Sequence, residues 1–432
     1  MQLKLLSFSK YIKNAILLMG DSIIKLIISF ILSIFIARTF GPTKFGQINY
    51  VLAVISILQV IVIFGFEDII LKDFGLEIKP DNTILRTVFL LRFFFAIFTY
   101  LLGIFLFYYF FDRSLLKTYL ILGLEFFCFI FYAYKQWFQI KSLNKYVVLA
   151  SQISFIVTTT LRIFYLIFFD NLYLYACILL MGLLIEDLVL FISFEQCKDS
   201  SVRHFDNEYA KKLLNSSWPL LLQNIAAIIY IRIDQIMVGK MLSISDVGIY
   251  SIGVTISELV YFIPNAIANA FYPKVAEAKK TENDYKSVAI RIGQMNVAVC
   301  LAFALFCTLI VPFLVTMVYG DAYSAAGRVI QIHSWAGIFV GIGCATGSVF
   351  IFEGKQKRLL ASSIFATILN VILNYLFIPL WGVNGAAIAT LLSYVFSVYL
   401  FHLFFKDKSY FVLRTKCFLF YQLLMLVRRK EK

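Results

Sequence analysis

Residues 87–110 read TVFLLRFFFAIFTYLLGIFLFYYF, an apolar run in which Arg92 is the one charged side chain. A helix of about 20 apolar residues is long enough to cross the roughly 30 Å hydrocarbon core of a bilayer. This run therefore predicts a membrane-spanning helix, and the same argument extends outward to the rest of the chain.

Similar apolar runs recur along the chain and fall into two groups of six, separated by the polar stretch EQCKDSSVRHFDNEYAKK (residues 195–212). We expect an all-α polytopic membrane protein with about twelve transmembrane helices in two parallel six-helix lobes around a central cavity. The predicted spans are residues 15–36, 47–66, 87–110, 115–134, 147–169, 172–194, 214–237, 248–271, 292–315, 329–352, 359–379 and 384–405.

The composition supports lipid as the solvent for much of the surface. Of 432 residues, 61% are hydrophobic and 15% are charged, whereas a soluble domain is about 45–50% apolar and about 25% charged. The formal net charge is +14, but the basic residues lie in short loops and not in a nucleic-acid-binding motif. We therefore expect membrane lipids as partners and no nucleic acid.

The loops also predict an orientation. With the N-terminus inside, the inner segments hold 29 Lys and Arg residues, the outer loops hold 6 when Lys117 at the start of the fourth span is counted with them, and 4 lie deeper within spans. Because cytoplasmic loops carry the excess of basic residues, both termini are expected to face the cytoplasm.

Four parts follow from this topology: an N-terminal lobe (1–194), a cytoplasmic linker (195–213), a C-terminal lobe (214–405) and a basic tail (406–432). Within the tail, CFLFYQLLMLV (417–427) is too short to span and is flanked by basic residues, so we expect it at the inner leaflet. A frayed tail with no membrane role is the alternative. The first apolar run is long, which favours an uncleaved first span over a signal peptide.

A short internal repeat links the two lobes. ARTFGPTKFG (37–46) follows the first span and GKMLSISDVG (239–248) follows the seventh, so an offset of 202 residues pairs Gly46 with Gly248. Because each lobe has an even number of spans, the repeats run parallel, and transporters built in this way hold substrate between their halves.

The sequence offers no catalytic or metal-binding constellation. Seven cysteines and three histidines are scattered, without a CxxC pair or a His cluster, and no nucleotide-binding P-loop motif occurs. We therefore expect no enzyme activity, no catalytic residue, no cofactor, no metal site and no direct use of ATP.

Charged residues inside the spans are the candidate functional residues, because each costs at least ~2.5–3.5 kcal/mol at mid-bilayer unless it faces a cavity or a partner. Arginine also holds phosphate with two parallel hydrogen bonds. The candidates for a substrate cavity are Lys25, Arg92, Arg162 and Arg232, and those for ion coupling or charge balance are Asp21, Glu125, Asp234 and Glu258.

Simpler roles stay open for some of these residues. Arg92, Arg162 and Arg232 lie near predicted helix ends, so their side chains could instead extend to the membrane surface. Lys25 follows Asp21 by four residues, and such a pair can form a purely structural ion pair. Polar residues at helical spacing, such as Asn370 and Asn374 in the eleventh span, predict interhelical surfaces or sugar contacts.

Several segments resemble one family. Residues 232–253 (RIDQIMVGKMLSISDVGIYSIG) and 373–394 (LNYLFIPLWGVNGAAIATLLSY) are similar to helix signatures of polysaccharide-transport proteins, as are residues 37–50 and 319–332. The chain thus resembles the O-antigen flippases of the multidrug/oligosaccharidyl-lipid/polysaccharide exporter superfamily.

This resemblance implies a flippase that moves an undecaprenyl-diphosphate-linked oligosaccharide from the inner to the outer leaflet of a bacterial inner membrane by alternating access. It implies a lipid-linked oligosaccharide as substrate, with a polysaccharide polymerase and a chain-length regulator as further partners. An ion-coupled exporter of small molecules and a membrane oligosaccharide polymerase are the alternatives.

Reporter fusions test the predicted orientation. A green fluorescent protein fused after residue 206, 355 or 432 should fluoresce, because each site lies on the predicted cytoplasmic side. Alkaline phosphatase fused after residue 112 or 242 should be active, because both sites lie in predicted outer loops. Fluorescence and phosphatase activity at the opposite sets of sites would contradict the orientation.

Overall fold

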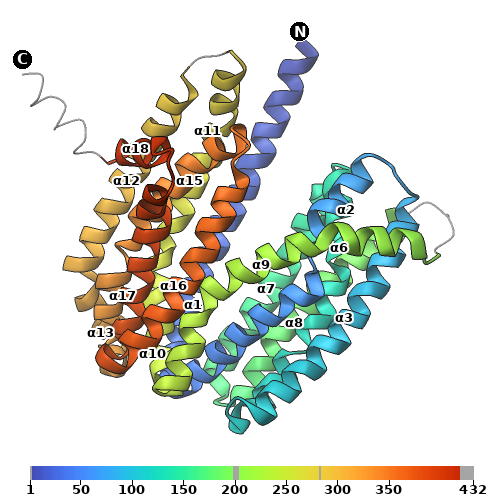
Figure 1. Ribbon diagram of the computed structural model, residues 1–432. Helices are drawn as coiled ribbons and strands as arrows, with labels where there is room; N and C mark the ends of the chain where they lie inside the picture. Colours follow the sequence, from blue (N-terminus) through green and yellow to red (C-terminus); the bar gives the residue numbers. More distant parts are fainter. Residues whose placement is uncertain (1, 198–203, 282–283, 419–432) are drawn as a thin grey trace, which may run out of the picture. The chain divides into compact units, whose positions relative to one another are not determined.

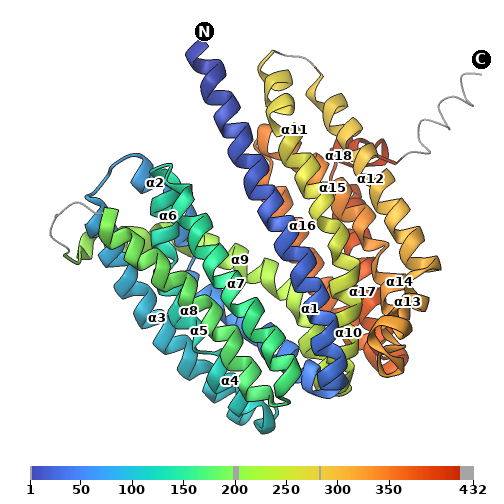
Figure 2. The ribbon, with the colours of Figure 1, turned by 180° about the vertical axis from the view of Figure 1, so that it is seen from behind.

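The computed structural model describes residues 2–197, 204–281 and 284–418, with side chains from residue 24 onward. Every element in these residues is a helix (Figures 1 and 2). The chain divides into two compact units. Unit 1 contains the residues up to Gly41 together with Val54–Asn224, and unit 2 contains Pro42–Ala53 together with the residues from Ile225 onward.

Unit 1 contains the spanning segments of the first part of the chain, one of which, Arg113–Ile140, is made of several short helices. It takes most of α1 and the start of α9, and both of these long helices also contribute residues to unit 2. Its helices are α1 (Gln2–Ile63), α2 (Phe66–Gly75), α3 (Asp81–Tyr109), α4 (Leu116–Leu122), α5 (Glu125–Cys128), α6 (Tyr132–Ile140), α7 (Asn144–Phe168), α8 (Leu172–Cys197) and α9 (Asn207–Met241), with 3-10 turns η1 (Arg113–Leu115) and η2 (Phe129–Phe131).

Unit 2 contains the helices of the second part of the chain. Its helices are α10 (Ile244–Glu258), α11 (Phe262–Lys280), α12 (Tyr285–Leu309), α13 (Val311–Tyr319), α14 (Ala326–His333), α15 (Ala336–Phe352), α16 (Gln356–Trp381), α17 (Val383–Tyr394) and α18 (Ser409–Thr415). Shorter turns are η3 (Leu259–Tyr261), η4 (Asp321–Tyr323), η5 (Val395–Tyr399), a π-helical turn, and η6 (Leu400–Phe404).

The all-α membrane fold predicted from the sequence is confirmed. The described residues contain eleven helical segments that are long and apolar enough to cross a membrane. The first of them, Ile24–Gly75, includes Gly41 with φ 65° and ψ 174°, so it joins two helices at a non-helical residue. The eleven segments therefore accommodate the expected count of about twelve. The lobe boundaries drawn from the sequence stay predictions.

Some helix ends differ from expectation for local reasons. α9 begins at Asn207, inside the predicted linker, because the Asp206 carboxylate accepts a hydrogen bond from the Tyr209 amide at 2.9 Å and caps the helix. The ninth span ends at Leu309 rather than continuing to residue 315, because Pro312 starts the separate helix α13.

The predicted tail is helical at its start. α18 packs Tyr410 and Leu413 against Ala289 and Val349 in a buried cluster of unit 2. Most of the apolar stretch 417–427 lies outside the described residues, so its position at the inner leaflet stays a prediction.

The helices turn apolar faces outward and polar faces inward, the reverse of a soluble protein. On α3, Phe94 and Phe98 are 66% and 58% exposed, whereas Arg92 and Thr99 are fully buried. α16 repeats the pattern, since Ile368 is 56% exposed and the asparagines Asn370 and Asn374 are fully buried. Such an arrangement is stable only when lipid surrounds the helices.

Small residues allow a close helix crossing in unit 2. A Cβ atom added to Gly46 would collide with the Ile244 carbonyl, and one added to Gly248 would collide with the Pro42 carbonyl. Gly46 and Gly248 are the two residues that the 202-residue offset pairs. Equivalent positions of the internal repeat thus meet, and only glycine leaves room for the contact.

Valine at either glycine is expected to destabilise this crossing. Gly46→Val or Gly248→Val should lower the thermal unfolding midpoint in detergent and reduce the yield of monodisperse protein, because overpacking a tight contact typically costs about 1–3 kcal/mol. Gly347→Val on α15 is the control, since no atom lies within 4 Å of a Cβ there. Equal midpoints for all three variants would refute the crossing.

Candidate functional site

A buried carboxylate, Asp234 on α9, lies at the centre of a hydrogen-bond network in unit 2. Asp234 is 5% exposed and accepts hydrogen bonds from the Tyr250 hydroxyl at 2.7 Å, from the Thr390 hydroxyl and from the Asn374 amide. Asn370 Oδ1 accepts from Asn374 Nδ2 at 3.1 Å. All of these donors are neutral, so they position the carboxylate without neutralising its charge.

The turn between α16 and α17 brings part of this network together. Gly382 has φ 58°, which glycine adopts readily. A Cβ atom at Gly385 would collide with the Phe377 carbonyl, so the two helices can pack closely only with glycine there. As a result α17 lies along α16, and Asn370 Nδ2 reaches the Thr390 hydroxyl at 3.4 Å.

The chemistry of this network suits a proton or a small hard cation. An ionised carboxylate held away from water is costly unless a proton or cation compensates its charge. The Asn374 Oδ1 atom is buried and has no hydrogen-bond partner in the described residues. Carboxylate, amide and hydroxyl oxygens are the ligands that hard cations prefer. The described residues contain no group of three or more His, Cys, Asp or Glu side chains that could hold a metal ion.

Two further predicted residues lie in the same region of unit 2. Glu258, at the end of α10, interacts electrostatically with both Arg232 and Asp234. Arg232 is half-buried, and its Nε atom has no hydrogen-bond partner among the described residues. Three of the charged residues selected from the sequence, Arg232, Asp234 and Glu258, are therefore neighbours in unit 2.

In unit 1, Arg92 is fully enclosed and does not extend to the membrane surface. Its Nη1 atom donates to the Phe129 carbonyl at 3.2 Å, and its Nε and Nη2 atoms have no hydrogen-bond partner in the part of the chain that the structure describes. Phe129 begins the 3-10 turn η2, and its carbonyl also accepts a hydrogen bond from the Tyr132 amide. Glu67 on α2 interacts electrostatically with Arg92.

The remaining predicted residues are spread over unit 1. Lys25 donates to the Ser151 hydroxyl at 2.7 Å. Arg162 is half-buried and has a buried Nε atom without a hydrogen-bond partner among the described residues. Glu125 is half-buried on α5. The side chain of Asp21 lies outside the described residues, so its predicted ion pair with Lys25 stays a prediction.

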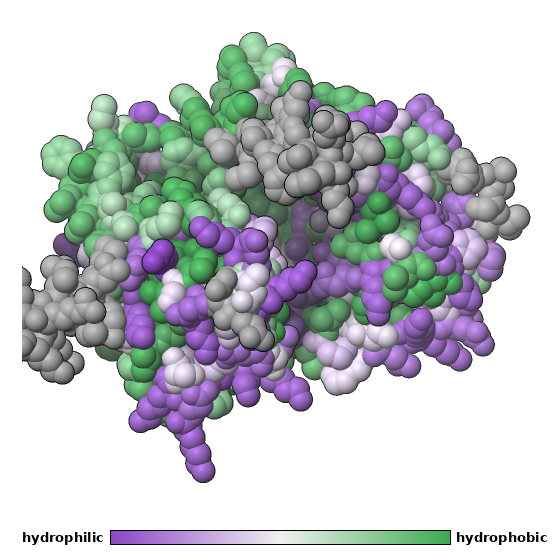
Figure 3. Space-filling model, turned by 90° about the horizontal axis from the view of Figure 1, so that it is seen from above, coloured by the Kyte–Doolittle hydropathy of each residue, from purple (hydrophilic) through white to green (hydrophobic). Residues whose placement is uncertain are grey.

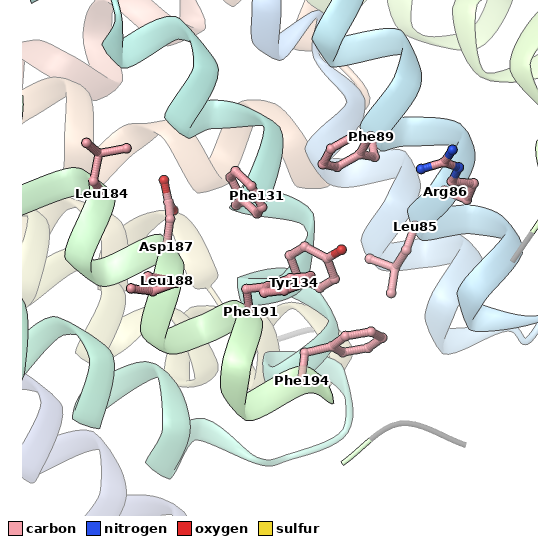
Figure 4. Close-up of a pocket in the computed structure, with 10 residues that line it drawn as sticks. All are labelled: Leu85, Arg86, Phe89, Phe131, Tyr134, Leu184, Asp187, Leu188, Phe191 and Phe194. Atoms are coloured by element: carbon pink, nitrogen blue, oxygen red, sulfur yellow. The ribbon is translucent and has the colours of Figure 1, made fainter. Parts of the chain in front are cut away.

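A cavity of about 430 Å³ lies between α3, α6 and α8 of unit 1 (Figure 4). Its walls are mainly aromatic and aliphatic, and Arg86 and Asp187 are the charged residues that line it. Leu184 and Leu188 on its α8 side are 49% and 57% exposed. None of the eight candidate residues lines this cavity, whose walls are mainly apolar.

The sequence indicated part of the Asp234 network but not all of it. Asp234, Asn370 and Asn374 were identified as polar residues within spans, whereas Tyr250 and Thr390 were missed. Glu67, which interacts with Arg92 in unit 1, was also missed. Thr390 lies four residues after Ala386 in the run GAAIAT, where a single hydroxyl is not distinguished from a packing residue. Its partnership with Asp234 depends on the α16–α17 turn, which spacing alone does not predict.

Comparison with known proteins gives consistent results. A family described as polysaccharide biosynthesis protein matches residues 35–328. A curated relative, the probable flippase AglR of Haloferax volcanii, is 30% identical over 40% of this chain and 37% of its own length. The chain thus matches less than half the length of this relative.

Solved structures share the fold over almost the whole chain. The lipid II flippase MurJ, in an inward closed conformation, has a TM-score of 0.71 at 13% identity and covers 95% of this chain and 93% of its own. An inward-facing multidrug resistance MATE transporter has a TM-score of 0.64 at 13% identity and covers 94% and 96%. At this level of identity the likeness concerns the fold alone.

The Asp234 network predicts a cation- or proton-dependent stability. Replacing choline chloride with sodium chloride, or lowering the pH, should raise the thermal unfolding midpoint of the wild type. A ligand that binds only the folded state at 100 times its Kd stabilises by about 2.7 kcal/mol. Asp234→Asn should lose this response, because the amide carries no charge to compensate.

Tyr250→Phe is the matched control. It removes one hydrogen bond to Asp234 and keeps the carboxylate, so its midpoint should be lower but should still respond to sodium or pH. A response in Asp234→Asn equal to that of the wild type would exclude Asp234 as the ion-binding group.

Proposed function

The chain belongs to the polysaccharide biosynthesis protein family, and we propose that it is a flippase that moves a lipid-linked oligosaccharide across the membrane. The family match over residues 35–328 is the observation that carries this proposal. The membrane-spanning helices with polar residues on their inward faces support it, because a polar headgroup needs a path that lipid does not provide.

The finer proposal concerns substrate and location. The substrate is an undecaprenyl-diphosphate-linked repeat unit of O-antigen or a related surface polysaccharide, and the membrane is a bacterial inner membrane with both chain termini in the cytoplasm. A polymerase and a chain-length regulator act on the product. Support for the lipid-linked class comes from the relative's description as a flippase and from the resemblance of residues 232–253 and 373–394 to polysaccharide-transport signatures.

Transport requires the charged headgroup to pass while the polyprenyl tail stays in lipid. A diphosphate is doubly anionic, so the cations Lys25, Arg92, Arg162 and Arg232 are proposed to attract it, with arginine supplying paired hydrogen bonds. The two lobes are proposed to expose a central cavity to each side in turn. Each lobe acts as a rigid body, and no covalent step on the substrate is required.

We assign ion coupling to Asp234. A proton or monovalent cation that crosses a membrane potential of 100 mV releases about 2.3 kcal/mol, and a tenfold concentration gradient adds about 1.4 kcal/mol. One ion therefore supplies enough free energy to favour one direction of transport by several hundredfold. We propose that Glu258 and Arg232 respond to the charge state of Asp234, because Glu258 interacts electrostatically with both of the other residues.

Lipid-linked intermediates in a deletion strain test the function. Loss of the gene should cause single lipid-linked repeat units to accumulate on the cytoplasmic leaflet and surface glycan to disappear, and the plasmid-borne gene should reverse both effects. The Asp234→Asn variant should insert normally and restore less than about a tenth of the surface glycan. Asp68→Asn, at an exposed acid in the first turn of α2, is the control and should restore it fully.

Other outcomes identify the alternative functions. Single repeats that reach the cell surface but are not polymerised would indicate a polymerase. Unchanged surface glycan together with increased sensitivity to cationic drugs would indicate a small-molecule exporter, the class to which the MATE structures of the same fold belong. Either result would overturn the flippase proposal.

A further inference from the structure

A basic pocket lies at one end of unit 2, separate from the Asp234 network. It has a volume of about 660 Å³ and lies where α16 begins and η6 ends. Four basic side chains and one acidic side chain line it. The lining residues with charge are Lys355, Lys357, Arg358, Lys406 and Asp407.

The pocket lies at the level of a membrane surface. The apolar segments around it end at Phe352, begin at Gln356 and end at Phe404, so the lining residues fall at the ends of three spanning segments. Figure 3 looks onto the end of unit 2 that carries α18, and hydrophilic residues gather on this face beside hydrophobic ones. The predicted topology places this end on the cytoplasmic side.

Arg358 is the rigid base of the pocket. It is 9% exposed, its guanidinium lies 3.9 Å from the centre of the Phe405 ring, and its Nη2 atom donates to the carbonyls of His402 and Asp407 at 3.2 and 3.1 Å. Its Nη1 atom lies 3.9 Å from the Asp407 carboxylate, which is itself exposed and hydrogen-bonded to the Ser409 amide at 3.0 Å. Asp407 thus offsets one of four positive charges.

Positive charge also accumulates behind the pocket. His402 lies between two guanidinium groups: Arg358 Nε is 3.1 Å from its Nδ1 atom, and Arg414 Nη1 is 2.5 Å from its Nε2 atom. A neutral imidazole has only one acceptor nitrogen, so one arginine N–H faces a ring N–H. Burial and the nearby Arg358 lower the pKa of Arg414 to about 9. An anion near this cluster would offset the repulsion between the Arg358 and Arg414 guanidinium groups.

An apolar surface continues from the pocket along the membrane-facing side of α16. Leu360 and Ile364 are 38% and 43% exposed, Ile368 and Ile372 continue the same stripe, and Phe404 on η6 is 76% exposed. A ligand with a phosphate at one end and hydrocarbon at the other matches both the basic pocket and the apolar stripe. A soluble phosphate matches only the basic pocket.

We propose that this pocket binds the phosphate headgroup of an anionic membrane phospholipid, with its acyl chains lying along the exposed stripe of α16. Arg358 supplies a fixed cation, and Lys355, Lys357 and Lys406 close around the phosphate from the two rims. Basic pockets at the cytoplasmic ends of transmembrane helices recognise anionic headgroups in this way. Because Arg358 connects through His402 to Arg414 of α18, an occupied pocket holds α18 against the rest of unit 2.

The triple variant K355Q/K357Q/K406Q tests this site in the full-length protein. The three lysines are exposed, so the variant is expected to fold. Purified protein in neutral detergent is titrated with dioctanoyl phosphatidylglycerol, and the thermal unfolding midpoint and the dissociation constant are measured. The variant should bind roughly 100-fold more weakly than the wild type, because each Lys near an anionic surface contributes about a factor of five.

The variant K274Q/K279Q/K280Q, which removes the same charge from exposed positions near the end of α11, is the control and should bind within about threefold of the wild type. Dioctanoyl phosphatidylcholine, glycerol 3-phosphate and inorganic phosphate should each give at most a small shift of the midpoint. Equal weakening in both triple variants would reduce the effect to general charge attraction and overturn the site. A full shift with inorganic phosphate would replace the lipid by a soluble anion, and tighter binding of a polyprenyl diphosphate than of phosphatidylglycerol would replace it by the transport substrate.

Discussion

The hydrogen bond from Arg92 to the Phe129 carbonyl illustrates the constraint on which the structure depends, namely that polar groups carried into lipid must find partners inside the protein. Each unsatisfied polar group in the hydrocarbon region costs several kcal/mol. The Asn296 amide nitrogen in unit 2 donates in the same way to the Gly341 carbonyl at 3.0 Å, whereas Asn296 Oδ1 and two of the Arg92 nitrogen atoms have no hydrogen-bond partner among the described residues. In the Asp234 network, Asn374 Oδ1 has no hydrogen-bond partner among the described residues, and the hydrogen bonds that the structure describes to the Asp234 carboxylate come from neutral groups. We propose that an ion completes this arrangement.

Some helix breaks occur in spans that the internal repeat pairs. The second predicted span is interrupted at Phe64 and Gly65, which both have positive φ, and the eighth is interrupted at η3. The fourth is interrupted at η2 and the tenth between α14 and α15. Spans two and eight, and spans four and ten, are equivalent under the repeat that pairs Gly46 with Gly248. Interrupted helices in equivalent positions of two repeats are typical of transporters, because the freed backbone and side-chain groups can serve a polar ligand.

The sequence predicts the fold well because lipid imposes a simple rule of length and polarity. The apolar runs predicted the spanning segments, and the asparagines of α16 lie on its inward face as their spacing indicated. The ends of individual helices were not predicted, since they depend on single contacts such as the Asp206 cap.

Only some of the partners of Asp234 were identified from the sequence, because Tyr250 and Thr390 come from other helices and are polar residues of a common kind. The basic pocket was also missed: Lys355 and Lys406 are 51 residues apart, and counting loop charges for topology gives no reason to combine them.

Together these features describe two helical units that each hold charged groups inside a membrane, in a chain that belongs to a polysaccharide biosynthesis family. The central claim is that the chain moves a lipid-linked oligosaccharide and that Asp234 couples this movement to an ion. Purified protein reconstituted in vesicles, with a short-chain polyprenyl-diphosphate oligosaccharide on one leaflet, tests it most directly through the rate at which the sugar becomes accessible to a glycosidase on the other side. We expect rapid exposure that depends on a sodium or proton gradient in the wild type and that falls to the protein-free rate in Asp234→Asn. Exposure in the wild type no faster than in protein-free vesicles would contradict the claim of flipping, and gradient-dependent exposure in Asp234→Asn would contradict the coupling role.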